Sequence, residues 1–120
     1  MTIAYWIVAA LLGAFYAHAG GKKLVQSAEQ LAPMMGWVDT VPMPVVRTIG
    51  ALEALAVVGL VLPPLTDVLP WLAIAAAVGL VVLQVLATAL HLSRGEVADV
   101  WLNVALVVMA AAAAWLATAL

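Results

Sequence analysis

Long apolar runs separated by short polar interruptions dominate the pattern of positions along the chain. Four of them approach the roughly 20 residues that a helix needs to cross the hydrocarbon core of a bilayer. These runs cover residues 3–18, 45–62, 69–92 and 100–119. They are apolar throughout and rich in Ala and Leu, without the alternation of apolar and polar residues that is typical of a membrane β-strand. The pattern therefore predicts four transmembrane helices.

The interruptions consist of residues that commonly end helices. Residues 20–23 (Gly-Gly-Lys-Lys) follow the first run, and residues 93–96 (Ser-Arg-Gly-Glu) separate the last two. Pro63 and Pro64 are expected to stop the second helix, because proline lacks an N–H and disfavours helical geometry in the residue before it. The fold class predicted is all-α, an integral membrane four-helix bundle that forms a single domain over residues 1–120.

The first connection is unusually long and carries its own apolar period. A helix over residues 24–35 would place its apolar side chains on one face and Gln26, Ser27, Glu29 and Gln30 on the other. Such a helix lies in the plane of the membrane surface, although Pro33 can end it a turn early. The segment that follows, which contains Trp37, could act as a lid over the bundle, or the connection could only anchor the loop.

Composition narrows the class of protein. Of the 120 residues, 68% are hydrophobic and 8% are charged, against about 45–50% and about 25% in soluble domains. This excludes a water-soluble globule, and the high hydrophobicity excludes disorder. Four basic residues and a net charge of −2 offer no patch for nucleic acid. The absence of cysteine excludes disulfides, thiolate nucleophiles, Cys-ligated zinc and iron–sulfur clusters.

The basic residues predict an orientation. Lys22, Lys23 and Arg47 flank the first connection and Arg94 lies in the third, so the positive-inside rule makes this side cytoplasmic and puts both termini outside. Tryptophans near both ends of the runs suit interfacial belts. The first run could instead be a cleavable signal peptide, but its lysines follow the apolar stretch, the reverse of a signal peptide's charge order.

A few polar residues lie inside the apolar runs, where such groups are costly and mark candidate functional sites. They are His18, Thr48, Glu53, Gln84, Thr88, His91 and Asn103. A rise of about 1.5 Å per residue puts the strongly polar ones in the predicted cytoplasmic half. The i, i+4, i+7 spacing of Gln84, Thr88 and His91 gives them one helix face. We expect a cleft that is polar at its base and apolar above, with His18 at its rim, suited to an amphiphilic ligand.

Each of these residues also has a purely structural interpretation. Glu53 could be protonated, or paired with His91 inside the bundle. Gln84 and Thr88 could form hydrogen bonds between helices, and Asn103 could cap the first turn of the last helix. Two histidines and one carboxylate could gather a cation, but their spacing matches no metal motif. We therefore expect no metal.

Several short motifs, taken in order and spacing, resemble the DoxX-like membrane proteins over residues 17–103. The motifs are Ala19-Gly20-x-x-Lys23-Leu24, Met35-Gly36-Trp37, Ile49-Gly50-Ala51-Leu52-Glu53, Gly59-Leu60-Val61-Leu62-Pro63 and His91-Leu92-Ser93-Arg94-Gly95-Glu96. The resemblance implies a four-helix bundle in the bacterial inner membrane beside redox proteins, since the family is named after a small subunit of a thiosulfate:quinone oxidoreductase. Glu53 and His91 match family positions. The cysteine of some redox relatives is absent, so electron transfer would need a bound quinone or haem.

Two main hypotheses of function follow. In the first, the chain is an auxiliary subunit that binds a quinone or lipid-like molecule for a membrane or cytoplasmic oxidoreductase, with His18, Trp37, Gln84, Thr88 and Asn103 as ligand-binding residues. In the second, it is a membrane enzyme of the isomerase, cyclase or hydrolase type. Glu53 would then be the general acid or base, and His91 or His18 would relay protons.

Two further hypotheses depend on less of the chain. A small proton-coupled exporter would also have four helices and one membrane glutamate, but exporters of that kind carry it in the first helix, whereas Glu53 is in the second. A structural interaction protein would use Ala110, Ala111 and Ala114 as a flat face for self-association or for a partner helix.

Overall fold

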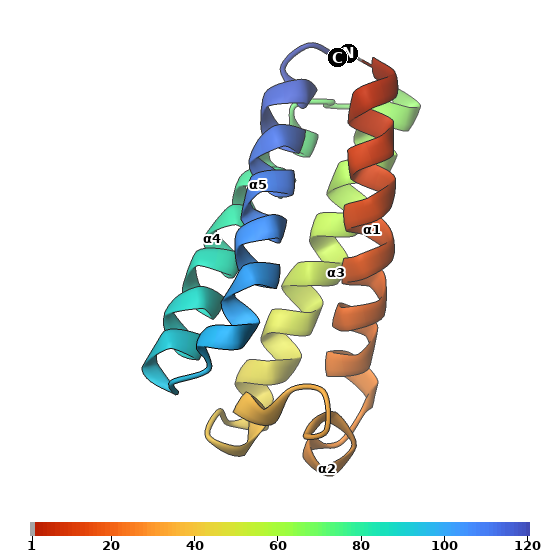
Figure 1. The fold of residues 1–120 in the computed structure, drawn as a ribbon. Helices are drawn as coiled ribbons and strands as arrows, with labels where there is room; N and C mark the ends of the chain where they lie inside the picture. Colours follow the sequence, from red (N-terminus) through yellow and green to blue (C-terminus); the bar gives the residue numbers. More distant parts are fainter. Residues whose placement is uncertain (1) are drawn as a thin grey trace.

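Four long helices run side by side in the computed structural model, which describes residues 2–120 and every side chain among them except that of Asp99 (Figure 1). They are α1 (Thr2–Val25), α3 (Met43–Thr66), α4 (Leu72–Ser93) and α5 (Val100–Ala117). All regular structure in this range is helical, and each long helix has the length and apolar composition to cross a membrane. The predicted all-α four-helix bundle is confirmed.

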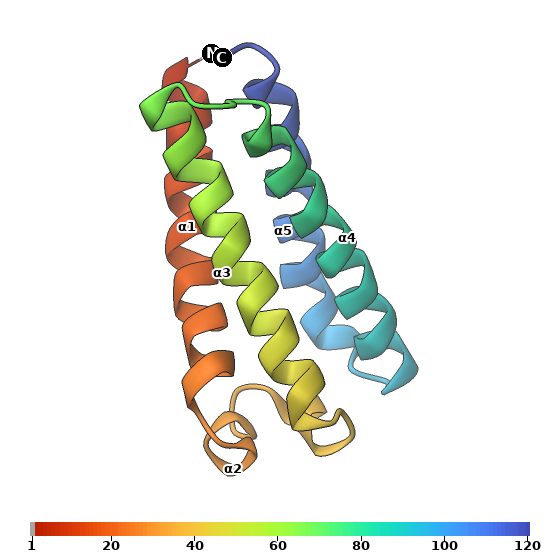
Figure 2. The ribbon, with the colours of Figure 1, turned by 180° about the vertical axis from the view of Figure 1, so that it is seen from behind.

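The helices pack as a closed ring in which α1 contacts α3 and α5, and α4 contacts the same two helices. Both termini lie at one end of the bundle, here called the terminal end (Figures 1 and 2). The other end, here called the α2 end, carries the short helix α2 (Ala28–Leu31) and the loop between α4 and α5. Side chains from all four helices, among them Tyr16, Leu60, Leu80 and Ala110, form the core.

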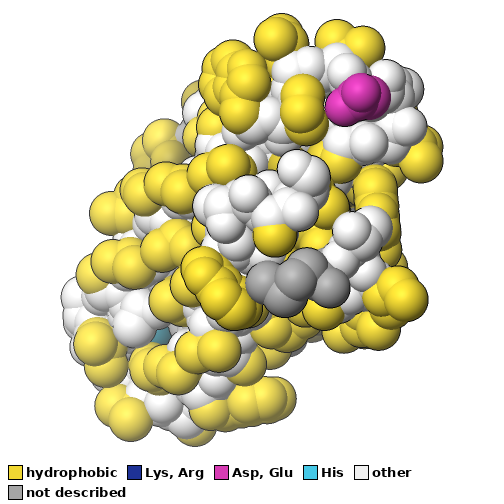
Figure 3. Space-filling view, turned by 90° about the horizontal axis from the view of Figure 1, so that it is seen from above, with side chains coloured by type: hydrophobic (Ala, Val, Ile, Leu, Met, Phe, Trp, Pro, Cys, Tyr) yellow, Lys and Arg dark blue, Asp and Glu magenta, His cyan; other side chains and the backbone are white. Residues whose placement is uncertain are grey.

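The outer surface is suited to lipid. Large apolar side chains such as Ile7, Leu55, Val82 and Val108 are more than half exposed. Viewed from the terminal end, the described surface is largely hydrophobic and shows no lysine or arginine (Figure 3). The basic residues lie at the α2 end, as the sequence pattern predicts: Lys22 and Lys23 in the last turn of α1, Arg47 near the start of α3 and Arg94 just after α4.

Helix α1 is longer than the predicted span of residues 3–18, because its two glycines do not end it. Gly20 packs against Gly50 so tightly that a Cβ on Gly50 would lie 2.9 Å from the Gly20 carbonyl oxygen. Arg47 then supplies hydrogen bonds at the end of the helix: its Nη1 donates to the carbonyl oxygens of Lys23 and Gln26, at 2.6 Å each. These are among the carbonyls that a helix C-terminus leaves without a donor.

Helix α3 is also longer than predicted and continues through Pro63 and Pro64 to Thr66. The expectation that the proline pair stops it was wrong. Pro64 has no N–H to give the carbonyl of Leu60 four residues earlier. The phenolic hydroxyl of Tyr5 on α1 donates to that carbonyl oxygen instead, at 2.6 Å, so the missing helical donor is replaced from a neighbouring helix.

The first connection contains a helix, but one much shorter than residues 24–35. Helix α2 is a single turn, with Ser27 as its N-cap in a capping box with Gln30. A turn containing Pro33 follows, and then the 3₁₀ helix η1 (Gly36–Asp39). Pro33 and the cap at Ser27 thus limit the helix at both sides, because a proline cannot donate to the preceding turn.

Candidate functional site

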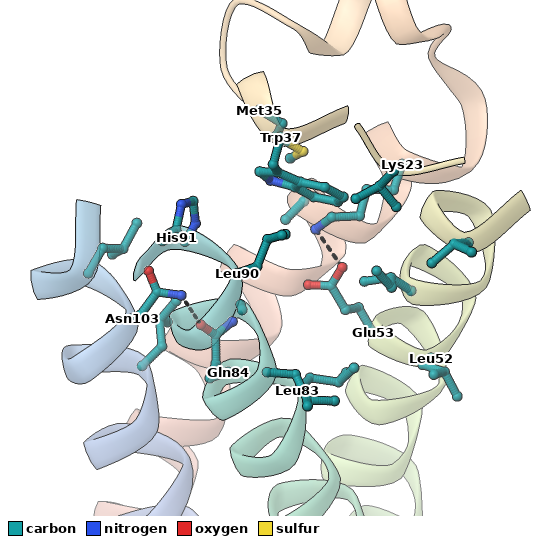
Figure 4. A pocket seen from close by; sticks show the side chains of 18 of the residues that line it. Lys23, Met35, Trp37, Leu52, Glu53, Leu83, Gln84, Leu90, His91 and Asn103 are labelled. Atoms are coloured by element: carbon teal, nitrogen blue, oxygen red, sulfur yellow. Dashed lines mark hydrogen bonds and ion pairs between the residues drawn. The ribbon is translucent and has the colours of Figure 1, made fainter. Parts of the chain in front are cut away.

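A cavity of about 520 Å³ opens among the helices at the α2 end (Figure 4). This volume lies within the range of small-molecule sites in proteins. Most of its lining is apolar, from residues such as Phe15, Leu83 and Leu90. The polar side chains that line it are Lys23, Glu53, Gln84, His91 and Asn103.

Lys23 and Glu53 form a buried ion pair on one wall of the cavity. Lys23 Nζ lies 2.6 Å from Glu53 Oε1, and the two side chains are 8% and 4% exposed. Taking two charges out of water costs several kcal/mol each, roughly, and their mutual attraction offsets this only in good geometry. The pair leaves Glu53 Oε2 and two of the three ammonium protons without a partner among the described contacts, so both residues can still bond a ligand.

Close packing of α1 on α3 sets the position of this pair. A Cβ on Gly50 would stand 2.8 Å from the Cβ of Lys23, and a Cβ on Gly20 would stand 3.2 Å from that of Glu53. Residues three apart on a helix share a face, so each glycine lies directly beside the charge that follows it. The two glycines thereby let Lys23 and Glu53 meet inside the bundle.

Two carboxamides form the second polar pair, on the opposite wall. Asn103 Nδ2 of α5 donates to Gln84 Oε1 of α4 at 2.9 Å, and both residues are buried. The amide group of Gln84 and the carbonyl of Asn103 remain available to a ligand. Tyr16, which lies near Gln84 and Glu53, has a buried hydroxyl without a hydrogen-bond partner in the described structure.

Trp37 and Met35 from the first connection cover the cavity (Figure 4). Arg94, just after α4, holds this cover in place. Its Nη1 donates to Asp39 Oδ1 and Thr40 Oγ1, both at 2.9 Å, and its Nη2 donates to the carbonyl oxygen of Gly36 at 3.3 Å. One guanidinium thus binds both ends of the 3₁₀ helix that carries Trp37.

Glu96 connects Arg94 to the cavity wall. Its Oε1 accepts from Arg94 Nε and from His91 Nδ1, both at 3.0 Å. The hydrogen bond from Arg94, followed by that from His91, lowers the pKa of Glu96 below its ordinary value of 4.5. Glu96 therefore stays ionised at neutral pH and fixes the orientation of the imidazole that lines the cavity.

The structure brings most of the predicted site residues together. Glu53, Gln84, His91, Asn103 and Trp37 all line the cavity. Two do not: Thr88 donates to the Gln84 carbonyl of its own helix at 2.7 Å, and His18 is exposed on α1. His18 does not close the rim because the buried face of α1 passes through its neighbours Tyr16 and Ala19.

The pairing of Glu53 with His91 was wrong, since each has another partner. Lys23 is the partner of Glu53 and was not among the predicted site residues, because a lysine just after an apolar run is typical of a charge that flanks the membrane. The signal for it is the repeated spacing in Gly20-x-x-Lys23 and Gly50-x-x-Glu53, which puts two glycines and two opposite charges in matching positions. In the part of the chain that the structure describes, no three acidic or histidine side chains gather as a metal site.

Comparison with known proteins agrees with the motifs. A family model described as the DoxX-like family matches residues 7–113, nearly the whole chain. No curated protein and no solved structure matches the chain.

Proposed function

The chain belongs to the DoxX-like family, and from this premise we propose that it binds a hydrophobic small molecule in the cavity at the α2 end. The ligand is quinone-like or lipid-like, with a polar group among Lys23, Glu53, Gln84 and Asn103. Its apolar part contacts the aliphatic lining. We further propose that the chain serves a redox system as an auxiliary subunit.

The ion pair between Lys23 and Glu53 is the observation that carries this proposal. Replacing a buried ion pair by apolar residues of similar size is often neutral or stabilising. Charged groups within membrane-spanning helices therefore point to function. Here the pair lies on the wall of a mostly apolar cavity, where its remaining donors and acceptor are within reach of a carbonyl or hydroxyl group.

The redox role is supported by the family, and the side chains present indicate what this chain would contribute to it. No cysteine is present in the 120 residues, and the lining offers hydrogen-bonding groups and one imidazole. This chain would hold and orient a redox-active molecule such as a quinone, while a partner oxidoreductase supplies or accepts the electrons.

A membrane enzyme is the second candidate, because a carboxylate and an imidazole line the same cavity. In that case Glu53 would transfer a proton to or from a bound substrate. A catalytic carboxylate predicts that the Glu53→Gln variant still binds its ligand but accumulates it unconverted. A binding role predicts that the same variant loses the ligand.

The experiment is extraction and mass spectrometry of the protein purified in mild detergent. We expect an enriched small molecule with the wild type, and its loss in the double variant Lys23→Met/Glu53→Gln, which removes both charges together. Thr88→Val is the matched control, because Thr88 lies on α4 outside the cavity lining. Bulk phospholipid alone in all three preparations would contradict the proposal.

We also propose that the α2 end is cytoplasmic and that the membrane is the bacterial inner membrane. The clustering of Lys22, Lys23, Arg47 and Arg94 at this end supports the orientation, and the family supports the membrane. Because the chain has no cysteine, single cysteines at Ser93 and Thr118 can be tested with an impermeant maleimide on whole cells. Thr118→Cys should be labelled and Ser93→Cys should not, and the reverse would contradict the orientation.

A further inference from the structure

A second hollow, of about 670 Å³, lies between α3 and α4 on the outer face of the bundle. It is lined by apolar residues and glycines that include Leu55, Gly59, Gly79 and Val82. Leu55 and Val82 are 66% and 54% exposed, so this groove opens toward the lipid. It extends along α3 from Leu52 to Pro63, which is about 16 Å at the helical rise.

The groove adjoins the cavity. Leu52 of α3 and Leu83 and Leu86 of α4 line both hollows. Leu83 extends toward α3 beneath the carboxylate of Glu53 (Figure 4). These three aliphatic side chains therefore lie on the boundary between the cavity and an apolar groove open to the bilayer.

The lining of the cavity indicates the charge of the group that fits there. Lys23 and Glu53 neutralise each other at 2.6 Å, and the remaining polar groups are two carboxamides and His91. An anionic head group bonded to Lys23 would add a second buried negative charge beside Glu53, and a cationic one bonded to Glu53 would add a second buried positive charge beside Lys23. An unpaired buried charge is strongly unfavourable, so an uncharged carbonyl or hydroxyl group is favoured.

We propose that the ligand is a long-chain amphiphile with an uncharged head group, whose chain leaves the cavity between Leu52 and Leu83 and lies in the groove between α3 and α4. This inference rests on the proposed binding function and adds the class of ligand and its route. The groove provides a floor for the chain, because α3 and α4 touch at Gly59: a Cβ there would lie 2.9 Å from that of Ala76. A Cβ on Gly79, by contrast, would have no neighbouring atom within 4 Å, so the groove is open at this position.

Photolabelling in nanodiscs tests the route. The probe is a long-chain alcohol with a diazirine in the middle of its chain, and the labelled residues are mapped by mass spectrometry. We expect Leu55 and Val82 to be labelled more strongly than the similarly exposed Val104 and Val108 of α5. The labelling of the groove should fall about tenfold when Gly79→Phe fills it. Gly21→Phe is the matched control, since Gly21 also has open space around it and lies outside both hollows.

The head group is tested with the fatty acid of the same chain and diazirine position. The proposal requires the alcohol to label the groove more strongly than the acid at a pH where the acid is ionised. Equal or stronger labelling by the acid would overturn the uncharged head group. Equal labelling of α5 and the groove by the alcohol would overturn the route, because bulk lipid would give that result.

A second alcohol, with its diazirine beside the hydroxyl, separates this inference from the binding function. If it labels Met35 or Leu90 while the mid-chain probe avoids the groove, the cavity binds the ligand and only the route is overturned. If the head-group probe does not label the cavity, the proposed function fails together with the inference.

Discussion

Lys23 of α1 and Glu53 of α3 meet at 2.6 Å because each stands three residues after a glycine at a close contact of the two helices. Gly20 and Gly50 bring the backbones together, and the helical period puts each charge on the same face as its glycine. Arg47 then fixes the end of α1 by donating to the carbonyl oxygen of Lys23 itself. The ion pair and the helix contact therefore form one structural unit.

Removing one charge of this pair is expected to cost more than removing both. Lys23→Met or Glu53→Gln alone leaves a buried charge without its partner and should lower the free energy of unfolding by about 3–5 kcal/mol. The double variant leaves no such charge and should return close to wild-type stability. Thermal unfolding in detergent, followed by circular dichroism, measures all three. Additive losses in the double variant would contradict the coupling.

Glycine to alanine substitutions test the helix contact separately. A Cβ on Gly50 would lie 2.8 Å from the Cβ of Lys23 and 2.9 Å from a backbone oxygen, so Gly50→Ala should destabilise the bundle by about 1–3 kcal/mol. Gly21 has nothing within 4 Å, and Gly21→Ala should stabilise α1 by about 0.5–1 kcal/mol. The same unfolding measurement compares the two, and equal effects would argue against a tight contact at Gly50.

These glycines also show why the fold was more predictable than its details. Four helices follow from the length of the apolar runs alone, because only helices and closed barrels satisfy the backbone in a bilayer. Whether a glycine ends a helix or packs against another depends on the partner helix, which local sequence does not specify. The same holds for Pro64, whose effect on Leu60 is compensated by Tyr5, 55 residues away in sequence.

The part of the site that consists of polar residues inside the apolar runs could be predicted from the sequence. Glu53, Gln84, His91 and Asn103 stand out as polar residues in apolar runs, and all four line the cavity. His18 stands out equally but is exposed. Helices that are apolar on all sides have no polar face to indicate which side is buried, so the direction of His18 could not be deduced. Lys23 was missed because it lies at the end of a run, where lysines are common.

Two buried tyrosines form a matched pair for testing hydrogen bonds. Tyr5 donates to the carbonyl of Leu60, whereas the hydroxyl of Tyr16 has no partner in the described structure. Tyr5→Phe leaves a buried acceptor without a donor and should cost about 1–3 kcal/mol. Tyr16→Phe removes an unsatisfied hydroxyl and should be neutral or stabilising. Thermal unfolding measures both variants, and a greater loss for Tyr16→Phe would indicate that its hydroxyl has a partner, such as the neighbouring side chain of Gln84.

The cover over the cavity should depend on Arg94. Arg94→Lys keeps the positive charge but loses the planar group that bonds Asp39, Thr40 and Gly36 together, so it should behave more like Arg94→Gln than like the wild type. We expect faster amide hydrogen exchange in residues 36–40 of both variants, measured by mass spectrometry. Glu29→Gln, an exposed change on α2, is the control and should leave the exchange unchanged.

Acid should weaken the link between Glu96 and its two partners. The pKa of Glu96 is lowered in the folded protein, mainly by Arg94 and then by His91. A lowered carboxyl pKa stabilises the fold above the unfolded value and loses that contribution as the pH falls through the folded one. The link should therefore hold at neutral pH and be lost only as the pH falls below 4.5 and through the lowered pKa of Glu96. Fluorescence of Trp37, in a variant whose other tryptophans are phenylalanine, reports the change. Glu96→Gln should show the weakened state at neutral pH and lose this transition, and an unchanged transition in that variant would assign it to another group.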